Sequence, residues 1–219
     1  MLFRSFGTER VRTIRDLKGK TVAVNLIDGG DHLFLSTMLA YVGLDPRRDV
    51  QWTAHEPAVA VQQLANGKVD AYLGFAPVPQ ELRAKKIGHV IVNTATDKPW
   101  SQYFCCMAIA NRGFVRRNPV ATKRALRALL KAADLCALDP ARAARYVMEK
   151  GYVSNYEYTL QTLRELPYNV WRTYSPEDTL RFHALRLRDI GVIKTNPNTL
   201  VAKVADWRFL RELKKELKA

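Results

Sequence analysis

A glycine turn beside an acid and an imidazole is the first place in this sequence where side chains could do chemistry. The run Thr21–Val24 is apolar and β-branched, as in a buried strand, and Leu33–Val42 has the apolar spacing of a helix. The first N–H groups of a helix lack partners within it, so the turn between these segments predicts a site for an anionic or hydrogen-bond-accepting ligand. An ordinary connection without a ligand is the alternative. The candidate ligand-binding residues here are Gly29, Gly30, Asp31 and His32, with Asp31 or a neighbour expected to cap the helix.

A second candidate turn carries an aromatic ring followed by a proline. The residues are Phe75, Ala76 and Pro77, directly after an apolar run. An aromatic side chain at a strand end can stack against a ligand, or it can be plain core. Gln102 adds an amide close to the next apolar run and completes the predicted ligand-binding set. No catalytic residue is predicted, because His55 and Glu56 have no partnered nucleophile or metal-ligand spacing.

The three cysteines do not form a metal or disulfide pattern. Cys105 and Cys106 are adjacent, which strains a disulfide between them, and Cys136 is distant in sequence. Both adjacent cysteines lie in the apolar run 103–110 and are expected to be buried strand residues. The sequence therefore predicts neither a metal site nor a cofactor.

Short strands alternating with helices surround the two candidate turns. Strands are expected at Thr21–Val24, Val50–Thr53, Val69–Phe75 and His89–Val92. Between them, helices are expected at 33–42, from His55-Glu56-Pro57 to about 65, and at 77–86. This alternation predicts a mostly parallel sheet in a three-layer α/β unit. Ligands of such sheets lie at the carboxyl ends of the strands, which here are residues 25–32, 53–57, 74–77 and 93–96.

Beyond residue 111 the pattern becomes helical. Helices are expected at about 120–137, 140–150, 154–165, 175–190 and 207–217. In the first of these, the apolar positions Leu126, Leu129, Leu130, Ala133 and Cys136 follow the helical period.

Composition excludes several classes of protein. The chain has 219 residues and a formal net charge of +14, most of it in the second half. The basic residues are spread over amphipathic helices, and neither a helix-turn-helix nor zinc-finger spacing is present, so nucleic-acid binding is not expected. No apolar run approaches the ~20 residues of a membrane span. The first ten residues lack the apolar core of a signal peptide, which by itself predicts a cytoplasmic chain.

Five motifs in order resemble one family. They are Asp-Leu-Lys-Gly-Lys-Thr-Val-Ala-Val at 16–24, Tyr-Val-Gly-Leu-Asp-Pro at 41–46, Gln-Leu-Ala-Asn-Gly-Lys-Val-Asp-Ala at 63–71, Phe-Ala-Pro at 75–77 and Val-Arg-Arg-Asn-Pro at 115–119. This order resembles the solute-binding proteins of nitrate/sulfonate/taurine-type ABC importers, a group that includes binders of thiamine-pyrimidine precursors. The resemblance implies a type II periplasmic-binding-protein fold, a periplasmic location, a small-molecule solute, a partner permease in the membrane, and a monomer without enzymatic activity.

The resemblance also implies a division of the chain and a missing part. Residues 1–16 would approach a hinge, 17–102 would form the second α/β lobe, 103–110 the returning hinge strand, and 111–219 the helical remainder of a first lobe. The opening units of that first lobe would be absent, which predicts an apolar surface on the helices.

Two features of the turns depart from the family's pattern. The family often has Trp-Glu-Pro where this chain has Phe75-Ala76-Pro77, which disfavours a cationic solute, whereas Asp28 and Asp31 would repel an anion.

Two other classes share the fold. An effector-sensing domain of a LysR-type regulator would normally follow a helix-turn-helix. A pyrimidine-synthase-like enzyme would carry a cysteine-rich iron motif, of which only Phe104-Cys105-Cys106 is a trace.

Overall fold

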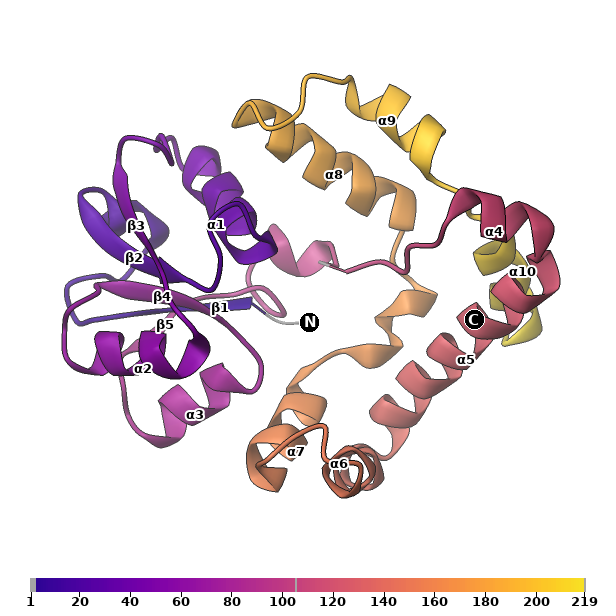
Figure 1. The fold of residues 1–219 in the computed structure, drawn as a ribbon, viewed down its shortest axis with the longest axis horizontal. Coiled ribbons are helices and arrows are strands. Elements are labelled where there is room, and N and C mark those ends of the chain that lie inside the picture. Colours follow the sequence, from indigo (N-terminus) through magenta and orange to yellow (C-terminus); the bar gives the residue numbers. More distant parts are fainter. Residues whose placement is uncertain (1–2, 105, 219) are drawn as a thin grey trace.

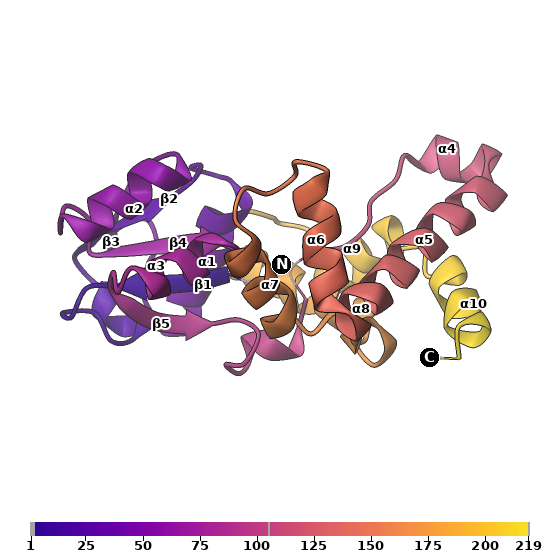
Figure 2. The same cartoon turned by 90° about the horizontal axis from the view of Figure 1, so that it is seen from below.

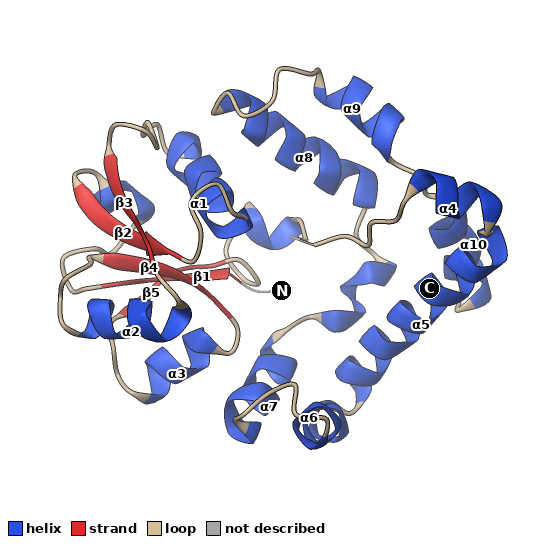
Figure 3. Ribbon diagram, in the orientation of Figure 1, coloured by secondary structure: helices blue, strands red, loops and turns tan. Residues whose placement is uncertain are grey.

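Five strands form one sheet at the N-terminal half of the chain. The computed structural model describes residues 3–104 and 106–218. Figure 1 and Figure 3 show the strands gathered at one end of the molecule, in the order β3-β2-β4-β1-β5. The strands are β1 (Phe3–Gly7), β2 (Lys20–Val24), β3 (Val50–Ala54), β4 (Ala71–Phe75) and β5 (His89–Asn93).

The sheet is mostly parallel, as predicted, with one reversed strand. β2 pairs in parallel with both β3 and β4. β1 lies between β4 and β5 and runs antiparallel to both. This strand lies within residues 1–16, which were predicted as an approach segment to a hinge, and it was not expected from the sequence.

Helices cover both faces of the sheet, which confirms the three-layer α/β prediction. α1 (Gly30–Tyr41) packs with Val22 and Leu73 in one core cluster, and α2 (Pro57–Ala65) and α3 (Val78–Ala84) pack with Ala23 and Tyr72 in another. Successive strand residues point to opposite faces, so β2 and β4 contribute side chains to both clusters. Two short 3-10 helices, η1 (Ile14–Leu17) and η2 (Trp100–Gln102), complete this region, which we call the sheet part (residues 3–102).

The helical part, residues 106–218, contains no strand among its described residues. Figure 2 shows α4 and α10 at the end of the molecule farthest from the sheet. Its elements are α4 (Arg112–Arg117), α5 (Pro119–Leu138), α6 (Pro140–Glu149), α7 (Tyr156–Glu165), η3 (Tyr168–Arg172), α8 (Pro176–Asp189), α9 (Pro197–Val204) and α10 (Arg208–Glu216).

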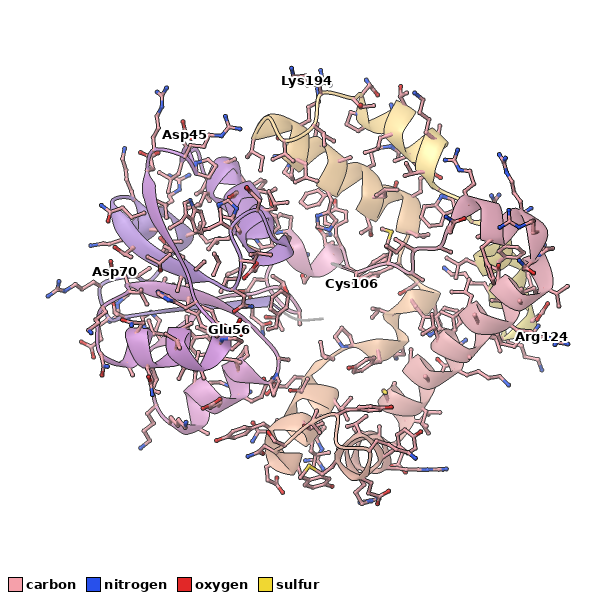
Figure 4. The ribbon with its side chains drawn as sticks, viewed as in Figure 1. Asp45, Glu56, Asp70, Cys106, Arg124 and Lys194 are labelled. Carbon is pink, nitrogen blue, oxygen red and sulfur yellow. The ribbon has the colours of Figure 1, made fainter. Side chains whose placement is uncertain are left out.

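The strand predicted at 103–110 is wrong for the residues described there. Residues 103–104 and 106–110 form a connection without a strand, since no neighbouring strand lies beside them to pair with. Ile109 is 94% exposed, and Cys106, labelled in Figure 4 between the two parts, is exposed rather than buried. Cys105 lies outside the described residues.

The predicted apolar surface on the helices is present. α5 has 20 residues, of which only Leu130 is buried. Leu129 and Leu135 are 58% and 41% exposed, and they flank a stripe of exposed alanines at 121, 125, 128 and 132. An apolar stripe of this width normally faces a core. Among the described helices, none is long and apolar enough to cross a bilayer.

Candidate functional site

The β2–α1 turn is held by its own side chains. Asp31 is 2% exposed, and its carboxylate accepts the backbone N–H of Asn25 at the end of β2. The helix cap is therefore not Asp31: Gly29 occupies the N-cap position and has no side-chain cap. The buried carboxylate fixes the start of α1 against the strand and is already hydrogen-bonded.

The two glycines of this turn have different roles. A Cβ on Gly29 would lie 2.8 Å from the carbonyl oxygen of Leu26, so only glycine fits there. Gly30 is exposed, and a Cβ there would meet nothing within 4 Å. The left-handed backbone of the turn falls on Asp28, with φ of 60°.

His32 is engaged within the turn and against β3. Its Nδ1 accepts the backbone N–H of Asp28 at 3.0 Å, and its ring meets Trp52 edge-on at 4.6 Å between centroids. Burial lowers the pKa of His32, against the opposing effect of Asp28. The ring is therefore neutral near pH 7, with its proton on Nε2.

The second candidate turn lies beside the first, because β2 and β4 are neighbours. Phe75 is half-buried and packs on the core cluster under α1, which supports the plain-core alternative for its ring. The carbonyl of Pro77 accepts the N–H groups of Gln80 and Glu81, and so starts α3. Pro77 also lines an open groove of about 720 Å³ between α3 and the α6–α7 turn.

Where the two parts of the chain meet, an aromatic cavity of about 110 Å³ is present. One wall follows β5 and includes Thr94 and Ala95, and the opposite wall comes from residues 166–174, at the end of α7 and through η3. No described residue that lines it is charged. The lining consists of Phe34, Thr94, Ala95, Ser101, Tyr103, Phe104, Leu166, Pro167, Tyr168, Val170 and Tyr174.

Hydrogen bonds and burial fix the walls of this aromatic cavity. The hydroxyl of Tyr174 donates to the carbonyl of Ser101 and joins the two walls. Phe104 stacks on Tyr174 with ring centroids 6.0 Å apart, and its carbonyl contacts Nε2 of His183 at 3.1 Å. Burial raises the pKa of Tyr168 to about 12, so its phenol stays neutral and can serve as a hydrogen-bond donor. The site offers aromatic faces and hydroxyl groups for binding.

None of the predicted ligand-binding residues lines the aromatic cavity. Gly29, Gly30, Asp31, His32, Phe75 and Ala76 belong to neighbouring turns at the carboxyl edge of the sheet, and Pro77 faces the larger groove. Gln102 is exposed, whereas the residues on either side of it, Ser101 and Tyr103, line the cavity.

The two opposite walls of the cavity were not predicted as ligand-binding residues from the sequence. Thr94 and Ala95 lie in the 93–96 loop, which the sequence predicts to end a strand at this edge. No sequence motif marks the wall at 166–174, because these residues meet the rest of the cavity only through contacts between positions distant in sequence. Of the described cysteines, Cys136 is half-buried, and burial raises its pKa. The described residues contain no group of three or more histidine, cysteine or acidic side chains placed to hold a metal ion.

We compared the chain with protein families and with known proteins. A sequence model described as the NMT1-like family matches residues 7–149. A search of curated protein sequences found no match.

Solved structures of binding proteins share the fold. A periplasmic nitrate-binding protein from Synechocystis has a TM-score of 0.75 at 16% identity, covering 99% of this chain and 65% of its own. A sulfonate-binding protein from Methylobacillus flagellatus has a TM-score of 0.69 at 19% identity, with coverages of 99% and 66%. The aliphatic sulphonate-binding protein of Escherichia coli has a TM-score of 0.68 at 21% identity, with coverages of 94% and 64%. The present chain thus spans slightly less than two thirds of each.

Proposed function

Because the chain belongs to the NMT1-like family, we propose that it is the solute-binding component of an ABC importer. It captures a small organic or oxyanion solute and delivers it to a membrane permease. Capture takes place in the periplasm, by a monomer that binds no nucleic acid and performs no chemistry on the solute. Solved structures with the same fold are named as nitrate-binding and sulfonate-binding proteins, which supports this role.

One observation carries the proposal: the aromatic cavity has one wall in each part of the chain. Thr94 and Ala95 come from the carboxyl edge of the sheet, where ligands of α/β sheets bind. Residues 166–174 come from the helical part. A solute held between walls on separate parts can couple its binding to their relative position, which is what capture and release require. The turns at Gly29–His32 and Phe75–Pro77 lie at the same edge of the sheet and form a further proposed contact region.

A thermal-shift panel with a cavity-filling variant tests the proposal. The panel consists of nitrate, alkanesulfonates, aromatic acids and pyrimidines. Ala95→Trp places an indole in a 110 Å³ cavity and should abolish the shift given by the native solute. Ala58→Trp, at an exposed position of α2, is the matched control and should keep it. A solute that stabilises the parent and Ala95→Trp equally would contradict the proposal, as would a panel without any response.

A further inference from the structure

Besides the hydrogen bonds from Tyr174 to Ser101 and from Arg47 to Ile190, an aromatic contact and a polar contact join the sheet part to the helical part. Figure 1 shows α1 beside α8 on one side and α3 beside α7 on the other. The first contact is aromatic: Trp100 of the sheet part meets Phe182 of α8 edge-on with ring centroids 5.8 Å apart, and Tyr103, in the connection between the parts, stacks on the same ring at 3.9 Å. The second contact is polar.

The polar contact centres on Glu165. Gln80 of α3 is 1% exposed, and its Nε2 donates to Oε2 of Glu165 at 3.0 Å. The guanidinium of Arg83, also on α3, pairs with Oε1 of the same carboxylate. The other end of the buried amide, Oε1 of Gln80, has no hydrogen-bond partner within the described residues. Glu165 is therefore bound from the sheet part by an amide that is only half satisfied.

Glu165 also adjoins the aromatic cavity through the chain. It is the last residue of α7, and the three residues that follow, Leu166, Pro167 and Tyr168, line the cavity. A displacement of the end of α7 from α3 therefore carries Leu166, Pro167 and Tyr168 away from Thr94 and Ala95.

The physical characters of the two contacts differ. The aromatic contact buries rings, which favours its persistence. The side chains of Arg83 and Glu165 are 39% and 27% exposed, so water can replace their ion pair when they separate. On opening, water can also reach the unpartnered oxygen of Gln80, which lowers the cost of separation.

We propose that Gln80, Arg83 and Glu165 form a latch that holds the aromatic cavity closed and sets how often it opens. This inference rests on the proposed function, because opening matters for capture and release of a solute. If a solute binds only the closed form, its apparent affinity falls in proportion to the fraction of molecules that are closed.

Pulsed electron–electron distance measurement tests the latch without a solute. Spin labels are placed at Ala84→Cys on α3 and Glu157→Cys on α7, both exposed, in a chain whose Cys105, Cys106 and Cys136 are serine. The parent should give one short-distance population. Gln80→Leu and Arg83→Gln should each raise a longer-distance population roughly tenfold, by removing a hydrogen bond to a charged group.

A matched arginine provides the control. Arg181 of α8 is 42% exposed in its side chain and pairs with Glu177 and Asp178 on its own helix. Arg181→Gln should leave the distances unchanged. Distance distributions of Gln80→Leu and Arg83→Gln that superimpose on the parent would overturn the latch, even if a solute binds. Latch variants that open while no solute binds would overturn the proposed function alone.

Discussion

Replacing Asp31 should destabilise the protein although no solute is present, because its carboxylate holds the β2–α1 turn. The side chain is 2% exposed and accepts the N–H of Asn25. Asp31→Ala removes a hydrogen bond to a charged group, worth about 1.5–3 kcal/mol, and leaves the Asn25 N–H without this partner. We expect a loss of about 2 kcal/mol in the free energy of unfolding. In a chain of this size that loss corresponds to roughly 4–8 °C in Tm.

Urea unfolding followed by circular dichroism measures this effect. The midpoint should fall while the slope of the transition stays constant. Asp31→Asn keeps an acceptor oxygen and should cost less than Asp31→Ala. Asp28→Asn is the control, since its side chain is 85% exposed and asparagine tolerates the left-handed backbone at this position. A free energy of unfolding of Asp31→Ala within about 0.5 kcal/mol of the parent, or an equal loss in Asp28→Asn, would contradict this role of the Asp31 carboxylate.

Three further predictions concern the turn, a half-buried histidine and the exposed helix. Gly29→Ala should lower Tm, because its Cβ would lie 2.8 Å from a carbonyl oxygen. Gly30→Ala should leave Tm unchanged, because a Cβ there meets nothing within 4 Å. Equal melting curves for the two variants would show that the turn adapts to the added Cβ. Burial lowers the pKa of His183 below its usual 6.5, so the unfolded state binds the proton more readily and stability should fall as pH drops below about 6.5. Urea midpoints at pH 5 and 7.5 should differ less in His183→Gln, and an unchanged difference would contradict this cause. Leu130→Ala should lower the free energy of unfolding by about 2–4 kcal/mol. Leu129→Ala, at a 58% exposed position, should change it by no more than about 0.5 kcal/mol. Similar urea midpoints for the two variants would contradict the burial of Leu130.

Much of the sheet part could be predicted from the sequence, because its signals are local. β2, β3 and β5 are short apolar runs ended by turn residues, and the structure places them within two residues of the predicted limits. α2 starts at Pro57, which suits a first helical turn. These features need no knowledge of distant contacts.

The sequence predictions were wrong where the structure of a segment depends on which other segment packs beside it. Residues 103–110 are apolar enough for a strand, but no strand lies beside the described ones, and Ile109 remains 94% exposed. The helix at 119–138 was placed within one residue, yet of the five apolar positions that follow its helical period only Leu130 is buried. Periodicity identifies the face of a helix that can be buried, and the packing partner determines whether it is.

The candidate site divides in the same way. The turns after β2 and β4 were found because glycine and proline mark strand ends, and the sheet brings them to one edge. The aromatic cavity was not found, because Tyr168 and Tyr174 reach Thr94 and Ala95 across the junction of the two parts. Asp31, chosen as a ligand contact, is engaged by the backbone of the turn.

The most direct test of the account is a crystal structure with the solute that gives the largest thermal shift. We predict electron density for that solute in the aromatic cavity, between Thr94–Ala95 and the wall at 166–174. Density in the groove beside Pro77 instead, or an aromatic cavity without solute at saturating concentration, would contradict the assignment of the site.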